Sequence, residues 1–131
     1  WACGYSGLVS RTTDGGKTWS LAGGVPATSN HYLYTMTWSD ETNGWIAGSG
    51  DATNNMFFTH NGGSTWSAAN SGLPAALLDV EFSDANNGYA VGQSVYIMKT
   101  TNGASATPVW TNVLPEARTF YIDNVRWSVN P

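Results

Sequence analysis

The clearest pattern along the chain is an alternation of apolar and polar residues that occurs three times. It occupies residues 34–40 (YTMTWSD), 78–84 (LDVEFSD) and, near the end, 123–128 (DNVRWS). Alternation places successive side chains on opposite faces of an extended strand. Each segment is therefore predicted to form a β-strand with two unlike faces.

Short apolar runs accompany these strands, and each run ends in glycine. They are residues 44–48 and 88–92, with residues 1–4 as a third copy. We interpret them as buried second strands that glycine turns close. Third strands are predicted at residues 8–12, 56–59 and 96–100, and fourth strands around Trp19, Trp66 and Trp110. Four strands with four connections make one repeat unit.

A glycine-rich turn marks each unit. Residues 12–19 (TTDGGKTW) return as 59–66 (THNGGSTW) and, less regularly, as 100–103 leading to Trp110. The tryptophans are 47 and 44 positions apart, a period typical of four-stranded propeller blades. Asp or Asn can accept backbone hydrogen bonds within such a turn, and the glycines allow positive φ angles. We expect the tryptophan to bury its ring against the next hairpin, and the third turn to open into a longer loop.

Together these motifs resemble the Asp-box, or BNR, propellers, and most closely the repeat of photosystem II assembly and stability factors. The resemblance implies an all-β fold, a β-propeller with four-stranded antiparallel blades, of which this chain holds about three. It also implies that the boxes are structural turns away from the ligand face, and no cofactor is expected. Asp boxes occur in sialidases, xyloglucanases and sortilin-type receptors too, so the resemblance specifies the fold better than the function. The structural box residues are Thr12, Asp14, Gly15, Gly16, Trp19, Thr59, Asn61, Gly62, Gly63, Trp66, Thr100, Asn102, Gly103 and Trp110.

The whole chain, residues 1–131, is predicted to be one propeller segment. Residues 1–26 supply strands two to four of a blade, 27–74 a second blade, 75–115 a third, and 116–131 the first strand of a next or shared blade. Three blades cannot close a ring. Further blades of a longer chain, or a second copy of this chain, are therefore expected to cover the open edges.

Composition fits an all-β protein that works outside the cytoplasm. Fifteen glycines, seven tryptophans and only 11% charged residues indicate many short strands and turns. We expect a secreted, periplasmic or cell-surface location, although the sequence contains no signal for it. Five basic residues and a net charge of −4 argue against a nucleic-acid partner. No apolar run approaches the roughly 18 residues of a membrane span.

Few residues could carry catalysis. A sialidase site needs three converging arginines, and the three present occupy unrelated places in the repeat. An inverting glycosidase would need two carboxylates about 6.5–9.5 Å apart, for which Asp79 and Asp123 are the best candidates. For both we favour a structural role, bonding backbone amides or capping loops.

The histidines and the cysteine add no clear site. His31 and His60 lack a second ligand at metal-binding spacing, so each is expected to be a solvated turn residue. Cys3 aligns with small apolar positions and is expected to be a buried, inert thiol. Trp38, Phe82 and Trp127 share one position of the first strand and are expected to be buried between blades.

Several aromatic residues are left over from the repeat and precede first strands, where loops line the channel entrance of a propeller. Tyr5 and His60 are placed on other turns. The candidate ligand face comprises Tyr32, Tyr34, Asp79, Phe120, Tyr121 and Asp123. Tyrosines often anchor peptides or stack on sugars, although ordinary loop packing would also explain them. The sequence therefore predicts a non-catalytic binding or assembly scaffold for a protein or glycan partner. A lectin-like carbohydrate-binding propeller and a fragment of a propeller glycoside hydrolase remain the alternatives.

Overall fold

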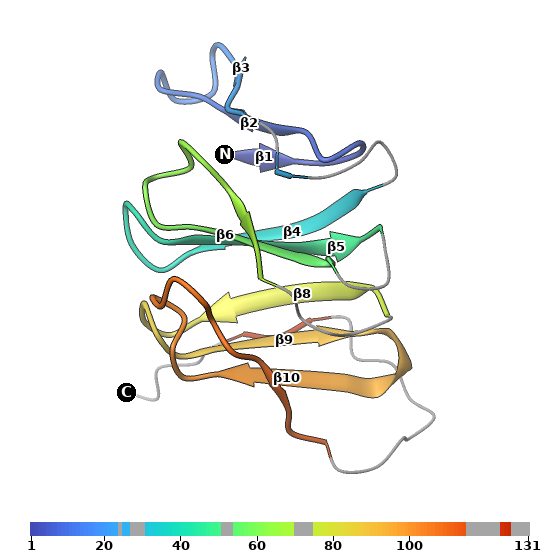
Figure 1. The fold of residues 1–131 in the computed structure, drawn as a ribbon. Coiled ribbons are helices and arrows are strands. Elements are labelled where there is room, and N and C mark those ends of the chain that lie inside the picture. The colour runs from blue at the N-terminus through green and yellow to red at the C-terminus, as the bar shows by residue number, and fades with distance from the viewer. Residues whose placement is uncertain (24, 27–30, 51–53, 70–74, 115–123, 127–131) are drawn as a thin grey trace.

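The computed structural model describes residues 1–23, 25–26, 31–50, 54–69, 75–114 and 124–126, and it consists of three antiparallel sheets (Figure 1). The first sheet contains β1 (Ala2–Cys3), β2 (Val9–Arg11) and β3 (Ser20–Leu21). The second contains β4 (Tyr32–Trp38), β5 (Gly44–Ser49), β6 (Met56–Thr59) and β7 (Ser67–Ala68). The third contains β8 (Leu77–Phe82), β9 (Gly88–Gly92), β10 (Tyr96–Thr100) and β11 (Thr111–Asn112), with the short 3-10 helix η1 (Gln93–Val95) before β10. Each sheet follows chain order, as propeller blades do.

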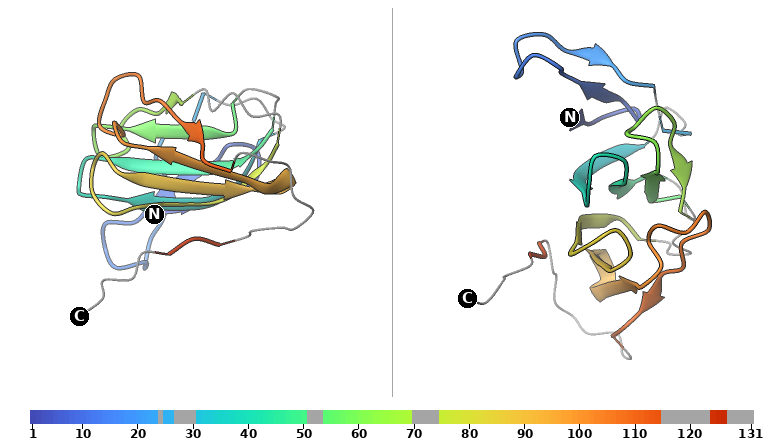
Figure 2. Two further views of the ribbon diagram at one scale, coloured as in Figure 1. Left: turned by 90° about the horizontal axis from the view of Figure 1, so that it is seen from below. Right: turned by 90° about the vertical axis from the view of Figure 1, so that its left-hand side faces the viewer.

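The three sheets are stacked face to face in a row, and their strands run in the same order in each sheet (Figure 2). The long strands β4 and β8 lie on one side of the row, and the short strands β7 and β11 lie on the other. The β2–β3, β6–β7 and β10–β11 turns lie at one end of the sheets, on the left in Figure 1. The β1–β2 turn and η1 lie at the opposite end. The box turns are therefore separated from the end at which β4 and β8 begin.

The middle sheet is buried on both faces because a sheet packs against each of them. Trp45 and Ile46 are neighbours in β5, so their side chains point to opposite faces. Trp45 belongs to the apolar cluster shared with the third sheet, and Ile46 to the cluster shared with the first. This double burial explains why residues 44–48 form a continuous apolar run.

The first strands of the two complete sheets share an irregularity. The pairing of β4 with β5 shifts register between Leu33 and Thr35, and β8 shifts at the equivalent place. A Cβ atom on Gly48 would lie 1.9 Å from the carbonyl oxygen of Tyr32, and Gly92 has a similar close contact in the third sheet. Only glycine allows this approach, which accounts for the glycine at the end of each apolar run.

Aromatic rings fill the boundary between the second and third sheets. Trp45 stacks on Phe82 with ring centres 4.6 Å apart, and Trp110 meets both rings edge-on at 5.5 and 5.8 Å. Phe58, the strand partner of Trp45, adds a tilted ring whose centre is 5.4 Å from that of Trp45. Phe82 is 7% exposed, as its place in the repeat predicts.

The equivalent rings between the first and second sheets are less enclosed. Trp1 stacks on Trp38 at 4.9 Å, and Trp66 meets Trp38 edge-on at 5.8 Å. Where the next boundary has Phe58, this one has Arg11, whose guanidinium lies 5.2 Å from the centre of the Trp1 ring. Trp38 consequently borders an open groove and is less deeply buried than Phe82, although it packs against the apolar cluster of the first two sheets. Trp127 lies outside the described residues.

Candidate functional site

The box turns close on themselves through their own side chains. In the first box, the Asp14 carboxylate accepts hydrogen bonds from the backbone N–H of Thr18 at 2.9 Å and from its hydroxyl at 2.6 Å. The hydroxyl oxygen of Thr12 accepts the N–H of Gly16 at 2.9 Å. Gly15 and Gly16 have φ angles of 72° and 89°. The hydrogen bonds from Thr18 lower the pKa of the Asp14 carboxyl to about 2, because they stabilise its charged form.

The other two boxes repeat this geometry with asparagine. Asn61 accepts the N–H of Thr65 at 3.0 Å, while Gly62 and Gly63 have φ angles of 64° and 76°. In the third box, Asn102 accepts the N–H of Val109 at 2.9 Å, seven residues onward instead of four. The longer loop is closed by the same hydrogen bond. In the second and third boxes, the hydroxyls of Thr59 and Thr100 donate to the side chains of Asn61 and Asn102 at 2.8 and 3.1 Å.

The box tryptophans do not share one environment. Trp66 and Trp110 are buried, but Trp19 is 51% exposed. The expectation that each box buries its ring is thus wrong for Trp19. The buried pair meets an aromatic ring of the first strand in its own sheet, and the first sheet has no such strand among the described residues.

A second turn repeats between the first and second strands of the complete sheets. Asp40 accepts the N–H groups of Thr42 and Asn43 at 2.7 and 2.8 Å, and Asp84 forms the matching bonds in the third sheet. Hydrogen bonds lower the pKa of both carboxyls. The largest effect comes from the Asn43 side chain at Asp40 and from the Asn87 side chain at Asp84. These carboxylates therefore act within their own turns.

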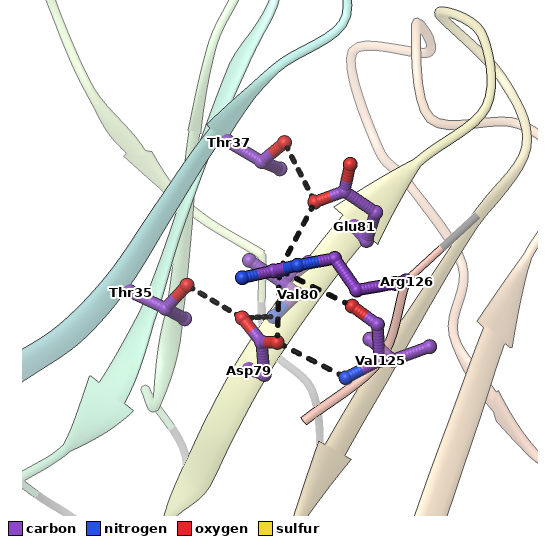
Figure 3. A network of polar contacts seen from close by, with 7 residues as sticks. All are labelled: Thr35, Thr37, Asp79, Val80, Glu81, Val125 and Arg126. Atoms are coloured by element: carbon purple, nitrogen blue, oxygen red, sulfur yellow. Dashed lines mark hydrogen bonds and ion pairs between the residues drawn. The ribbon is translucent and has the colours of Figure 1, made fainter. Parts of the chain in front are cut away.

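A ladder of polar side chains connects the first strands of neighbouring sheets (Figure 3). The hydroxyl of Thr35 in β4 donates to Asp79 in β8 at 2.8 Å, and the hydroxyl of Thr37 donates to Glu81 at 3.4 Å. Each pair is 44 residues apart, which is one repeat. The polar positions of the alternating pattern thus face one another across the boundary between sheets.

Asp79 extends this ladder to residues 124–126. Its carboxylate accepts the backbone N–H of Val125 at 3.0 Å, and a guanidinium nitrogen of Arg126 lies 3.4 Å away. The same nitrogen lies 4.0 Å from Glu81. Asp79 is only 5% exposed, so its carboxylate links strands and is not displayed on the surface as a ligand-face residue would be. Its proposed acidic partner, Asp123, lies outside the described residues.

The tyrosines of the candidate ligand face are exposed and lie at the end opposite the boxes. Tyr32 and Tyr34 are 45% and 51% exposed in the first half of β4. Tyr5, which was placed on a different turn, lies beside them: its ring centre is 5.0 Å from that of Tyr32. The two residues also form an isolated β-bridge, which explains the proximity that the repeat pattern did not predict. Phe120 and Tyr121 lie outside the described residues.

Neither histidine is a solvated turn residue. His31 is 2% exposed, and its Nε2 lies 3.1 Å from the carbonyl oxygen of Asn54. His60 bridges two sheets, with Nδ1 2.6 Å from the Oδ1 of Asn43 and Nε2 3.0 Å from the carbonyl oxygen of Ser105. The prediction for His31 ignored the β5–β6 connection of its own sheet, which its ring contacts, and the prediction for His60 ignored the third sheet.

The remaining titratable groups offer little chemistry. Cys3 is half-buried, and burial raises the pKa of its thiol. Across the described ranges, no group of three or more His, Cys, Asp and Glu side chains could hold a metal ion. The same part of the chain contains no helix with the length and apolar character to cross a bilayer.

Comparison with known proteins agrees with this arrangement of boxes and sheets. A family model described as the photosynthesis system II assembly factor YCF48 matches residues 23–100, more than half of the chain. The chain belongs to this family. A solved structure described as "YCF48 bound to D1 peptide" is similar, with a TM-score of 0.70 and 22% sequence identity. The match covers 88% of this chain and 36% of that one, so the chain spans about a third of the length of this relative. None of the curated proteins matches.

At that identity the structural likeness shows the fold, and the fold is that of a β-propeller segment. The three sheets fall within residues 1–26, 27–74 and 75–115 and correspond to successive blades. β4 and β8 are the first strands of the two complete sheets, and residues 124–126 are joined to β8 through Asp79.

Proposed function

We propose that the chain forms part of a non-catalytic scaffold that holds a partner polypeptide. The observation that carries the proposal is the match of residues 23–100 to the family model of an assembly factor. The similar solved structure is described as bound to a peptide, which supports the same role. A propeller suits it, because rigid blades can present loops in fixed positions.

The polar ladder supports a structural role for the carboxylates of Asp79 and Glu81. Asp79 accepts hydrogen bonds from Thr35 and from the N–H groups of Val80 and Val125. Glu81 accepts a hydrogen bond from the hydroxyl of Thr37 and forms an ion pair with Arg126. A glycosidase would instead need carboxyl groups that reach the glycosidic oxygen and a water molecule.

Parallel binding assays on a peptide array and a glycan array test the proposed function. The labelled protein should bind a subset of peptides and no glycan above the level of the heat-unfolded protein. Binding to glycans alone would favour a lectin-like propeller. Hydrolysis of fluorogenic glycosides would favour the glycosidase alternative.

We also propose that the chain works outside the cytoplasm. The abundance of glycine and aromatic residues, and the small charged fraction, support this location. Cell fractionation with an antibody against the chain tests it. Recovery with cytoplasmic markers alone would contradict the proposal.

A further inference from the structure

Exposed apolar side chains gather where the first two blades meet, at the end opposite the boxes. Tyr5 is 62% exposed and Leu8 51% exposed in the β1–β2 turn. Tyr32 and Tyr34, at the start of β4, are comparably exposed. We call Tyr5, Leu8, Tyr32 and Tyr34 the tyrosine surface. Isolated exposed apolar residues are common, but a group of four from two blades needs an explanation.

The β1–β2 turn holds its part of this surface in a fixed position. Ser6 and Gly7 have φ angles of 57° and 68°, and the N–H of Leu8 donates to the carbonyl oxygen of Tyr5 at 3.2 Å. These features belong to a tight two-residue hairpin turn. The N–H of Gly7 donates to the carbonyl oxygen of His31 at 3.2 Å, which ties the tip of the turn to the next blade.

The two tyrosines of β4 are positioned just as closely. The ring of Tyr32 meets that of Tyr5 edge-on, with an angle of 73° between the rings. The Tyr34 hydroxyl lies 2.9 Å from the hydroxyl of Ser49, which is the strand partner of Tyr32. The surface therefore needs little ordering when a partner binds, which lowers the entropic cost of association.

The repeat itself does not require tyrosine at these places. β8 has the same register shift as β4, yet Ala76 and Leu78 stand where β4 has Tyr32 and Tyr34. The backbone thus forms equally well with smaller residues. Tyrosine in the second blade adds exposed aromatic area without a role in the shared fold.

We propose that the tyrosine surface is the docking site for an extended polypeptide segment with uncharged, apolar side chains; this inference rests on the proposed function. None of the described residues that form or anchor the surface is Asp, Glu, Lys or Arg, so an uncharged segment would leave no charge buried without a partner. Tyrosine and leucine would cover such side chains and exclude water from them.

The geometry favours a polypeptide over a glycan as the occupant. Stacking on a sugar needs an aromatic face that lies open and flat, and Tyr5 and Tyr32 meet edge-on. No described carboxylate or side-chain amide belongs to the surface to bind sugar hydroxyls. Exposed tyrosine and leucine side chains instead offer apolar area to the side chains of a polypeptide.

Fluorescence polarisation with three sets of capped ten-residue peptides tests this inference. The sets are uncharged and apolar, acidic, and basic. The uncharged set should bind most tightly, and Tyr5→Ser or Tyr32→Ser should weaken its binding at least tenfold. Tyr32→Phe keeps the ring and should change binding less than threefold. Leu21→Ser changes an apolar residue on β3 that is more exposed than either tyrosine, and it should leave binding unchanged.

Each alternative result has its own meaning. If peptides bind but both serine variants bind equally well, the scaffold role stands and the tyrosine surface is the wrong site. Preference for the acidic or basic set overturns the proposed chemistry, and tyrosine-dependent glycan binding overturns the class of partner. Concentration-dependent dimerisation that Tyr5→Ser abolishes would make a second copy the occupant. Binding of no peptide set contradicts both proposals. Circular dichroism of every variant verifies that it is folded.

Discussion

Replacing Phe82 by Ala should lower the free energy of unfolding by about 4–5 kcal/mol. The ring is 7% exposed between two sheets, and truncation of a buried Phe costs about 3–5 kcal/mol. Its stacking on Trp45 and edge contact with Trp110 place the effect in the upper part of this range, since such pairs add roughly 0.5–1.5 kcal/mol. With a urea dependence of about 2 kcal/mol per molar, the unfolding midpoint should fall by roughly 2 M.

Urea unfolding followed by far-UV circular dichroism measures this loss. Tryptophan fluorescence is unsuitable, because Phe82 touches two tryptophans whose emission would change with the substitution alone. Leu21→Ala is the control: this side chain is 71% exposed, and its loss should cost less than about 0.5 kcal/mol. A loss below about 1 kcal/mol for Phe82→Ala would refute the aromatic packing between the second and third blades.

Three further predictions follow from the polar side chains. Asp14→Ala should lower the melting temperature because the turn loses its side-chain acceptor, whereas Asp14→Asn should have little effect because Asn61 accepts the same bond in its box. A carbon-13 NMR titration of the Asp14 carboxyl should give a pKa of about 2, below the unfolded value of about 3.9. The stability that this carboxylate adds to the fold is complete above the unfolded pKa and is lost as the pH falls through 2. A titration midpoint near 4 would contradict the box geometry. Asp79→Ala should accelerate amide hydrogen exchange at Val125, whereas Glu81→Ala should not, and equal exchange in both variants would mean that Asp79 does not hold residues 124–126.

Local repetition made the blades predictable from the sequence. The alternating strands and apolar runs recur in register with the boxes, so each copy supported the interpretation of the others. β6, β9 and β10 have the predicted bounds, and β4 begins and ends two residues early. The third box keeps its geometry although its loop is longer. Asn102 accepts the backbone N–H seven residues onward, where the other boxes use the one four residues onward.

Contacts between blades were harder to predict, because they depend on how neighbouring sheets face one another. The pairs Thr35–Asp79 and Thr37–Glu81 lie one period apart, and this spacing was the signal that could have revealed them. His60 shows the limit of the repeat, since its contact with Ser105 depends on the irregular loop of the third box. Nor could the repeat predict that Tyr5 lies against Tyr32.

Hydrogen–deuterium exchange with and without the tightest-binding uncharged peptide tests the central claim most directly. The claim is that this chain holds a polypeptide at the end of the blades opposite the boxes. Bound peptide should slow exchange in residues 4–8 and 31–34, which carry and anchor the tyrosine surface, and leave the box residues 12–18 and 59–65 unchanged. Protection of the boxes without protection of residues 4–8 and 31–34 would contradict the account.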